Sequence, residues 1–382
     1  MARRRILVVF GTRPEAVKLC PLVRALAARD GEFEVRTCVT GQHRAMLDQV
    51  LNAFCVAPDH DLDLMRPGQA LGRTVARILE AMEQVLHREN PDTVVVQGDT
   101  STTFAAALAA FYQGFPVAHV EAGLRTGNKL SPFPEEMNRL LTSRLADLHF
   151  AATEWAANNL RAEGVADDSI SVTGNTVIDA ALHIRSQLES GALPRPEWPH
   201  LDPSKNLILV TAHRRESFGA GFGRICQALK VLASRGDVQI AYPVHRNPNV
   251  LDPVREALGG LSGIELLESL EYVPFVDLMT RCYLILTDSG GIQEEAPSLG
   301  KPVLVMRENT ERPEAVEAGT ALLVGTDVDR IVGETTRLLD DQARYESMAR
   351  RHNPYGDGKA SERIAGALAK HEWRHGGAGL VR

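Results

Sequence analysis

The sequence lacks the marks of several large classes of protein. Its five cysteines form no CxxC pair and lie mostly in apolar segments, which indicates reduced core thiols rather than a disulfide framework. Neither a GxGxxG fingerprint nor a Walker loop is present, which argues against NAD and nucleoside triphosphates as ligands. No apolar run approaches the roughly 18 residues of a membrane-spanning helix, so no membrane partner is expected.

An excess of positive charge is also missing. The 42 lysines and arginines are outnumbered by 49 acidic residues, and the net charge of −7 shows no nucleic-acid footprint. Any phosphate group is therefore expected to be bound locally, and no nucleic acid, metal or other cofactor is expected. The basic segment Met1–Arg5 leads into apolar Ile6–Phe10, which stops at Gly11 and is typical of a buried strand rather than a signal peptide. A cytoplasmic location is the expectation.

The pattern along the chain is that of repeated βα units. Short β-branched runs alternate with segments of helical period, and nearly every run is apolar throughout, as in strands covered by helices on both faces. The strands expected in the first half are Arg5–Phe10, Phe33–Thr40, Thr93–Gln97, Pro116–Val120, Leu148–Ala151 and Ser169–Thr173. Those expected in the second half are Leu207–Thr211, Val238–Pro243, Glu265–Leu267, Tyr283–Thr287, Pro302–Met306 and Ala321–Val324.

The predicted fold class is α/β, with two Rossmann-like doubly wound domains and a cleft between them. At about 150 residues per domain, 382 residues suit two to three domains. The proline-rich segment Gly191–Asn206 has the composition of a linker, whereas the strand count favours a hinge near Gly174. We adopt the second boundary, which separates an N-terminal domain of residues 1–173 from a C-terminal domain that begins at residue 174.

Polar residues follow the expected strands, where ligands bind in open α/β sheets. The segment Gly11–Glu15 places Arg13 near a helix N-terminus and outlines an anion site, although a plain turn with a surface arginine explains the same residues. Asp99 and Glu121 each end a strand. If those strands are neighbours, the two carboxyl groups share one site and one of them has a raised pKa. Asp99 by itself is equally explained as a helix cap.

Charged motifs also occur on a helix and after two later strands. Glu135 and Arg139 are spaced to pair across one helical turn, although a solvated ion pair is the common outcome of such spacing. His213-Arg214 and His245-Arg246 follow two strands of the second domain and concentrate positive charge there. One histidine at a strand end is more often structural, but two such ends in one domain indicate a function.

The segment Asp288–Glu295 leads from a strand into a helix through Ser289-Gly290-Gly291. The serine hydroxyl, the glycine amides and the helix dipole form a cradle suited to a pyrophosphate. Glu295, one turn into the helix, is placed to accept hydrogen bonds from a ribose diol. A simple glycine turn is the alternative explanation.

Together these motifs resemble those of the non-hydrolysing UDP-N-acetylglucosamine 2-epimerases of bacteria, and the likeness spans nearly the whole chain. The segments that carry it are Gly11–Glu15, Gln97–Thr100, His119–Thr126, Pro134–Arg139, His213–Glu216, Asp288–Glu295, Gly300–Val303 and Thr310–Ala315. The resemblance implies a glycosyltransferase-B-like fold. It also implies a C-terminal helix around Glu362–His371 that returns to the first domain, so that residues 360–382 join 1–173 and the second domain is 174–359.

The resemblance implies the reversible epimerisation of UDP-N-acetylglucosamine to UDP-N-acetylmannosamine, by a homodimer that supplies N-acetylmannosamine units for cell-surface polysaccharide. UDP is eliminated to give 2-acetamidoglucal and adds back with a proton delivered to the opposite face, without a cofactor. Closure of the two domains would retain this intermediate. The residues thereby assigned to catalysis are Asp99, Glu121, Glu135 and His213. Those assigned to UDP and the sugar are Arg13, Lys18, Arg139, Phe275, Ser289, Gly290, Gly291, Glu295 and Arg312.

Some members of the family have a second, allosteric nucleotide-sugar site, at which UDP-N-acetylglucosamine activates its own epimerisation. The residues that match this site are Gln42, His43, Arg214 and His245. Ala45 and Gly68 fall where certain members carry a longer polar side chain and an arginine, which argues against strong activation.

Three other functions are compatible with parts of this pattern. A hydrolysing relative would release N-acetylmannosamine and UDP. A glycosyltransferase of the same shape would need an acceptor groove, and a nucleotide-sugar sensor would keep the cradle without catalysis. The three carboxylates Asp99, Glu121 and Glu135 favour the epimerase over the last two.

Overall fold

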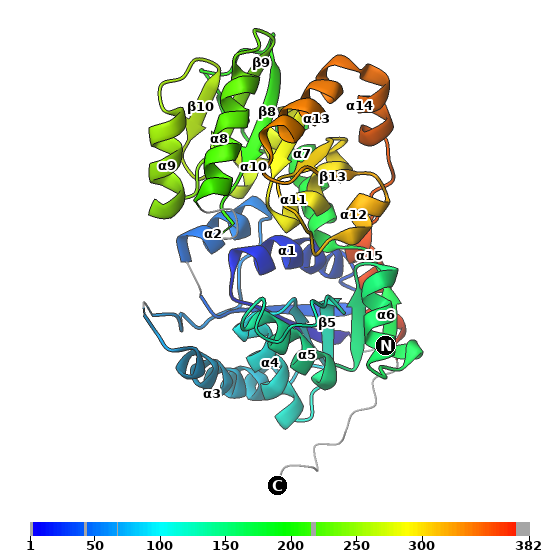
Figure 1. Cartoon of the computed structure of the whole chain (residues 1–382). Coiled ribbons are helices and arrows are strands. Elements are labelled where there is room, and N and C mark those ends of the chain that lie inside the picture. Colours follow the sequence, from blue (N-terminus) through cyan, green and yellow to red (C-terminus); the bar gives the residue numbers. More distant parts are fainter. Residues whose placement is uncertain (1–2, 42–43, 67, 215–218, 372–382) are drawn as a thin grey trace. The chain divides into compact units, whose positions relative to one another are not determined.

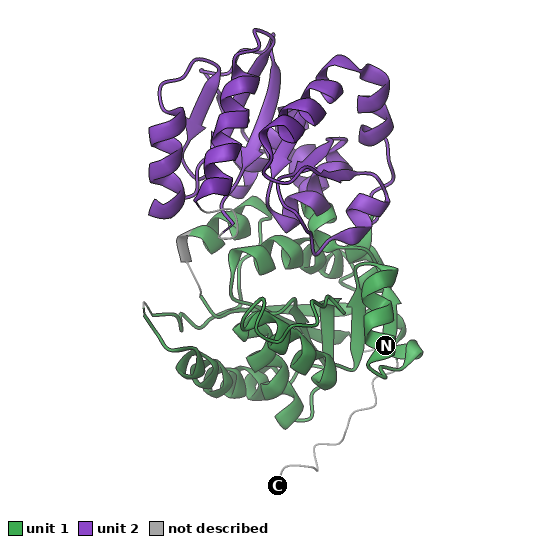
Figure 2. Ribbon diagram, viewed as in Figure 1, with its two compact units in different colours: residues 1–180, 355–382 green, residues 181–354 purple. Residues whose placement is uncertain are grey.

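The chain folds into two α/β units. The computed structural model describes residues 3–41, 44–66, 68–214 and 219–371 (Figure 1). Residues 1–180 and 355–382 form unit 1, and residues 181–354 form unit 2 (Figure 2). The hinge and boundaries expected from the sequence, at 173/174 and 359/360, remain a prediction.

Within the described residues, unit 1 is built on a seven-stranded parallel sheet in the order β3-β2-β1-β4-β5-β6-β7. The strands are β1 (Arg4–Phe10), β2 (Phe33–Val39), β3 (His60–Asp61), β4 (Thr93–Gln97), β5 (Val117–Ala122), β6 (Leu148–Ala151) and β7 (Ile170–Val172). From Ile6 to Phe10, β1 is completely buried, because helices cover both faces of the sheet. β3 contains only two residues, which is too short to show a period, and the sequence did not predict it.

The helices of unit 1 form a layer on each face of the sheet (Figure 1). One layer contains α1 (Arg13–Ala27), α2 (Arg44–Ala53) and α15 (Ala360–Lys370), and the other contains α3 (Leu71–Glu89), α4 (Ser101–Tyr112) and α5 (Glu135–Leu145). The buried alanines of α4 let α3 and α5 approach it closely. The remaining helices are α6 (Glu154–Ala162), the 3₁₀ turn η1 (Asp167–Ser169) and α7 (Thr176–Glu189), which continues into unit 2.

Threonine side chains begin several of these helices just after a strand. The hydroxyl oxygen of Thr12 accepts the Glu15 N–H at the start of α1, and Thr100 accepts the Thr103 N–H at the start of α4. Each such cap stabilises its helix by about 1 kcal/mol. Because Thr100 is the cap of α4, the explanation of Asp99 as a helix cap is wrong, and its carboxylate is available for other partners.

In the described part of unit 2, six parallel strands lie in the order β10-β9-β8-β11-β12-β13. They are β8 (Asn206–Thr211), β9 (Val238–Pro243), β10 (Ile264–Leu267), β11 (Leu284–Thr287), β12 (Val303–Val305) and β13 (Ala321–Leu323). All the strands expected from the sequence are therefore present, with small shifts at their ends, and the prediction of two Rossmann-like sheets is confirmed.

The helices of unit 2 are α8 (Ala220–Ala233), α9 (Pro248–Leu258), α10 (Tyr272–Arg281), α11 (Gly290–Glu295), α12 (Pro313–Glu317), α13 (Val328–Asp340) and α14 (Gln342–Ala349). α11 gives way to the 3₁₀ turn η3 (Ala296–Leu299), where Pro297 has no N–H for an α-helical bond. The sequence did not predict α14, which is short and whose large apolar side chains, Tyr345 and Met348, are only partly buried.

Two further features concern surfaces. No helix among the described residues is both long enough and apolar enough to span a bilayer.

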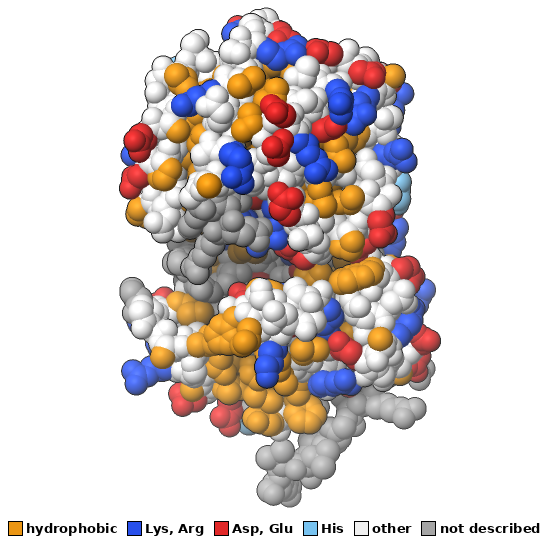
Figure 3. All heavy atoms as spheres, viewed as in Figure 1, with side chains coloured by type: hydrophobic (Ala, Val, Ile, Leu, Met, Phe, Trp, Pro, Cys, Tyr) orange, Lys and Arg blue, Asp and Glu red, His pale blue; other side chains and the backbone are white. Residues whose placement is uncertain are grey.

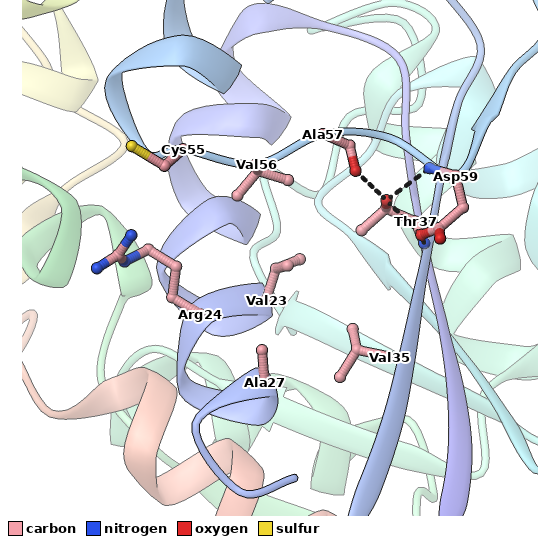
Figure 4. A pocket seen from close by; sticks show the side chains of 9 residues that line it. All are labelled: Val23, Arg24, Ala27, Val35, Thr37, Cys55, Val56, Ala57 and Asp59. Carbon is pink, nitrogen blue, oxygen red and sulfur yellow. Dashed lines mark hydrogen bonds between the residues drawn. The ribbon is translucent and has the colours of Figure 1, made fainter.

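Unit 1 contains a pocket of about 360 Å³ formed by α1, β2 and the loop after α2 (Figure 4). It is lined by Val23, Arg24, Ala27, Val35, Thr37, Cys55, Val56, Ala57 and Asp59. None of the residues predicted to bind or convert a ligand is among them.

Candidate active site

The predicted acidic residues of unit 1 lie where its strand order reverses. The order runs outward in opposite directions from β1 and β4, and ligands of doubly wound sheets bind beyond the carboxyl ends of strands at such a point. Asp99 follows β4, and Glu121 lies near the end of β5. Because β4 pairs directly with β5, the expectation that these strands are neighbours is confirmed.

Glu121 interrupts the regular register of β5 against β6. Its φ of +62° is unusual for a residue with a side chain, and the pairing shifts between Val120 and Ala122. The carboxylate contacts Lys18 Nζ at 2.6 Å through both oxygens and accepts from Asn175 Nδ2 at 3.1 Å. Gln97 Nε2 also donates to it. The irregular backbone thus directs the Glu121 carboxylate toward a cation and two amide donors.

Asp99 has a different environment from Glu121. Its side chain is 27% exposed, and Oδ2 lies 2.7 Å from Arg139 Nη2. Burial raises the pKa of the Asp99 carboxyl, the guanidinium of Arg139 opposes that shift, and the charges of Glu121 and Glu135 add to it. A carboxyl group with a raised pKa, accessible from solvent, can accept and return a proton.

Arg139 does not form the expected pair with Glu135. Its guanidinium contacts Asp99 and, at 3.4 Å, Glu136. Glu136 is buried and accepts the backbone N–H groups of Thr126 and Gly127 at 2.9–3.1 Å, so it holds the preceding loop. Glu135, the first residue of α5, is partly exposed and has no ion pair of its own among the described residues. The fold brings Asp99 to the Arg139 guanidinium, so Arg139 pairs with Asp99 rather than with Glu135, the residue four positions before it.

Glu15 is a contributor to this site that was quoted in a motif but given no role. Its carboxylate is 1% exposed and accepts from the backbone N–H groups of Gly11 (3.0 Å) and Thr12 (2.7 Å) and from the hydroxyls of Thr100 (2.7 Å) and Thr103 (3.1 Å). Burial raises the pKa of this group, and its hydrogen bonds with Thr100, Thr12 and Gly11 oppose the shift. Glu15 thereby ties the loop after β1 to the loop after β4. The capping box formed with Thr12 is the sequence signal that could have found it.

The turn that presents Asp99 has a second buried support. Gly98 adopts a φ of +70°, which glycine tolerates, and its carbonyl accepts a hydrogen bond from His119 Nε2 at 2.7 Å. His119 is completely buried, and burial lowers its pKa to about 3. His119 is therefore a neutral structural histidine.

Two predicted cationic residues of the site belong to α1. Arg13 is the first residue of this helix, and Lys18 lies five residues further along it.

The strand order of unit 2 reverses between β8 and β11, and the second group of predicted residues lies at the ends of these strands. Ser289 is the N-cap of α11, and Gly290 and Gly291 are its first two residues. A Cβ on Gly290 would lie 3.2 Å from Glu311 Oε1. The absence of a side chain at Gly290 therefore lets the segment that contains Glu311 lie close to it. The predicted cradle is therefore lined by Arg214, which contacts Glu311 at 3.1 Å, and by Arg312.

Neighbouring carboxylates hold the rest of this segment in place. Glu295 is buried and accepts a hydrogen bond from the Tyr272 hydroxyl at 3.1 Å. Arg312, predicted to bind UDP, donates to the buried Glu294, while Glu311 also accepts from Arg307 at 2.6 Å. Phe275 is in the first turn of α10 and partly exposed.

His213 and His245 lie together at the ends of β8 and β9. Their rings stack with centroids 5.5 Å apart, so the histidines that the sequence placed at two strand ends are neighbours. Arg214 directly follows His213, so Arg214 and His245 belong to neighbouring loops. Gln42 and His43, which are predicted to share a second site with them, lie outside the described residues. Asp288, which had no predicted role, contacts the His213 loop directly.

The end of the chain carries a metal-binding sequence motif. His371–His375 reads HEWRH, which matches the HExxH pattern of helical zinc sites. That pattern requires both histidines on one helical face, but α15 ends at Lys370, and His371 has an extended backbone with ψ of 128°. Residues 372–375 lie outside the described residues. The described ones contain no group of three side chains able to hold a metal ion.

The chain is similar to known proteins over nearly its whole length. Residues 24–369 match the family described as UDP-N-acetylglucosamine 2-epimerase. The chain is 59% identical over 369 residues to the UDP-N-acetylglucosamine 2-epimerase of Escherichia coli O157:H7, which covers 95% of this chain and 98% of the relative. The crystal structure of UDP-GlcNAc 2-epimerase from Neisseria meningitidis bound to UDP-GlcNAc has a TM-score of 0.88 at 47% identity, over 96% of this chain and 100% of that one.

A calicheamicin glycosyltransferase, CalG4, shares the fold alone, with a TM-score of 0.59 at 18% identity over 97% of this chain and 99% of that one. The two Rossmann-like units thus form a fold of the glycosyltransferase-B-like class. Within that class, the chain belongs to the UDP-N-acetylglucosamine 2-epimerase family. The resemblance drawn from the sequence motifs is confirmed.

Proposed function

We propose that the chain interconverts UDP-N-acetylglucosamine and UDP-N-acetylmannosamine by inverting C2 of the sugar, without hydrolysing the nucleotide sugar. The observation that carries this proposal is the pair Asp99 and Glu121, which lie on neighbouring strands and contact different cations, Arg139 and Lys18. Membership of the family supports the same reaction. The Neisseria relative bound to UDP-GlcNAc supports the same ligand.

The chemistry explains why two carboxylates are needed. The C2 proton is not adjacent to a carbonyl carbon, so direct deprotonation is too costly, and elimination is the accessible route. One carboxylate takes the proton from C2, the electron pair of that bond forms a C1=C2 double bond, and the C1–O bond breaks with its electrons leaving on UDP. UDP then adds back to C1 of 2-acetamidoglucal while a second acid protonates C2 on the opposite face.

Each predicted residue has a task in this scheme. Asp99, Glu121 and Glu135 are the acid/base candidates, Lys18 and Arg139 orient the sugar and its charges, and Arg13 stabilises the departing UDP. His213 stabilises the departing UDP, together with Ser289, Gly290, Gly291 and Arg312. Their donors counter the negative charge that develops on the diphosphate. Glu295 accepts from the ribose, and Phe275 contacts the base.

We also propose an oligomeric state and a cellular location for the protein. We infer a homodimer, because hydrophobic side chains gather on the exposed surface of unit 1 over α4, α5 and the segment before α5 (Figure 3). These are Phe111, Tyr112, Leu130, Phe133, Met137 and Leu141. Sedimentation equilibrium should give the mass of two chains. The five free thiols suit the cytoplasm, where the product would feed a cell-surface polysaccharide.

A second nucleotide-sugar site involving Arg214 and His245 also remains a prediction. If it operates, UDP-N-acetylmannosamine alone should be a poor substrate until UDP-N-acetylglucosamine is added. Full activity on UDP-N-acetylmannosamine alone would count against such a site.

Proton NMR of the enzyme with UDP-N-acetylglucosamine in deuterated water tests the proposed reaction. The expected product is UDP-N-acetylmannosamine carrying deuterium at C2, formed without added NAD, metal or acceptor. Free N-acetylmannosamine with UDP would instead identify a hydrolysing enzyme. Unchanged substrate would contradict the proposal.

Arg139→Met should shift the pH dependence of this reaction. The catalytic base must be ionised, so kcat/KM falls as pH decreases through its pKa. Because Arg139 lowers the pKa of Asp99, its removal should raise that pKa and move the acid limb of the kcat/KM profile to higher pH. We expect activity near pH 6 to fall by about tenfold or more, with a smaller loss near pH 9. Arg139→Lys keeps the charge and should move the limb less; equal shifts in both variants would contradict this role.

A further inference from the structure

The clearest unused group near the cradle is the carboxylate of Asp288. This residue follows β11 and is completely buried. Its Oδ2 accepts the backbone N–H groups of His213 and Arg214, each at 2.7 Å. Its Oδ1 accepts no hydrogen bond from the described residues and lies 3.5 Å from His213 Nδ1. A buried carboxylate oxygen without a donor is costly, and the imidazole is the group positioned to relieve it.

The surroundings of His213 favour a neutral ring in the free protein. Burial lowers the pKa of His213, the charge of Asp288 opposes this, and His245 and Arg214 add to the lowering. His245 stacks on the ring, and its own Nδ1 accepts the Asn247 N–H at 3.1 Å. Arg214 in turn is paired with Glu311. Of these groups, the Asp288 carboxylate is the one whose oxygen lies next to His213 Nδ1.

This geometry selects one tautomer of the neutral ring. A proton on Nδ1 points toward Asp288 Oδ1, whereas a proton on Nε2 would leave two lone pairs facing each other across 3.5 Å. With its proton on Nδ1, His213 presents the lone pair of Nε2 on the opposite edge of the ring. A phosphate oxygen is repelled by that lone pair unless the ring takes up a second proton.

We propose that Asp288 is a positioning residue that holds the His213 ring with Nδ1–H toward Asp288 Oδ1 and with Nε2 toward the diphosphate of UDP. A proton that the ring takes up when the nucleotide binds is then on Nε2 when UDP leaves. The proton comes from solvent on binding and returns to it on release. The imidazolium donates from Nε2 to a phosphate oxygen, while Asp288 stabilises its positive charge. This inference rests on the proposed function, because it names UDP as the leaving group.

Asp288→Asn separates this role from a purely structural one. The two backbone N–H groups require an acceptor, so the amide oxygen replaces Oδ2 and the loop after β8 is retained. The amide nitrogen then faces His213 Nδ1 and donates to it, which forces the ring proton onto Nε2. The substitution thus reverses the tautomer while leaving the backbone contacts in place.

Three measurements on the full chain give the test. By ¹⁵N NMR near pH 8, His213 should be protonated on Nδ1 in the wild type and on Nε2 in Asp288→Asn. Calorimetry of UDP binding in buffers of different ionisation enthalpy should show an uptake of close to one proton for the wild type and none for the variant. The kcat should fall by about 10²- to 10⁴-fold, as when an amide replaces the carboxylate that orients a catalytic histidine, with KM changed less than about tenfold.

Several results would overturn the proposal. A wild-type ring protonated on Nε2, or UDP binding without proton uptake, contradicts it even if the variant does not fold. A loss of kcat in Asp288→Asn with an unchanged tautomer would make the carboxylate merely structural. In a His213→Asn background, Asp288→Asn should cause no further loss, and an additional tenfold loss also contradicts the proposal. The spectroscopic and binding readouts need no turnover, so a failure of the proposed function appears separately, as wild-type enzyme that forms no epimer.

Discussion

Asp99→Asn is expected to lower kcat by about 10²- to 10⁴-fold, which is the usual contribution of a positioned acid/base group. Asparagine has nearly the shape of aspartate, and its amide oxygen can still accept from Arg139 Nη2, which lies 2.7 Å from Asp99 Oδ2. It cannot take a proton from C2. Because most of the groups proposed to bind UDP belong to unit 2, the dissociation constant of UDP should change less than about threefold. Turnover is measured by NMR and UDP binding by calorimetry.

The matched control is Asp92→Asn, at the other end of the same strand. Asp92 precedes β4, and its Oδ2 accepts the Arg5 N–H at 2.7 Å, a role that an amide oxygen can also fill. This variant loses the same charge and should keep turnover within about threefold of the wild type. If Asp99→Asn also stayed within tenfold of the wild type, Asp99 would be removed from the mechanism.

Gly123→Ala is expected to destabilise the fold by about 3–5 kcal/mol. Gly123 follows β5 with a φ of +88°, and a Cβ there would lie 2.2 Å from the carbonyl oxygen of Ala156 and 3.0 Å from Leu160 Cγ. The oxygen belongs to the backbone of α6, which the Asn159 side chain links to Gly123 O at 2.9 Å, so it cannot move away cheaply. Urea unfolding followed by circular dichroism gives the free energy of unfolding.

Gly164→Ala provides the control for conformational strain. Gly164 has a similar φ of +83° and also lies beside α6, but a Cβ there would meet no atom within 4 Å. Its cost should be that of a side chain in the left-handed region alone, about 1 kcal/mol. The difference between the two variants therefore measures the clash with α6, and equal losses would show that the clash is relieved by movement.

The elements of the fold were largely predictable because their signals are local. An unbroken apolar run such as Val94–Val96 is buried on both faces, and its length and neighbours identify it as a strand. The exceptions have equally local reasons. β3 contains two residues, and α14 is short with apolar side chains that are only partly buried, so neither shows the clear apolar pattern on which such predictions depend.

The side chains of the candidate site were predictable as a set, but their partners were not. The positions of Asp99, Glu121 and His213 after apolar runs placed them at the carboxyl ends of strands, and the structure puts them there. Their roles in the reaction remain predictions. The sequence spacing suggested Glu135 as the partner of Arg139, whereas the contacts are with Asp99 and Glu136.

The sequence by itself determined two βα series, the ends of their strands and the residues that follow them, because burial and helix capping act over a few neighbouring residues. Only the tertiary structure decided which of these residues meet. Lys18 of α1 contacts Glu121 of β5, and His213, after β8, lies beside Asp288, after β11; in each case the two residues are far apart in the chain. Such pairs depend on strand order and on the exact backbone path at the sheet edge, including the positive φ of Glu121. No local pattern carries that information, since it arises only when the whole sheet has formed.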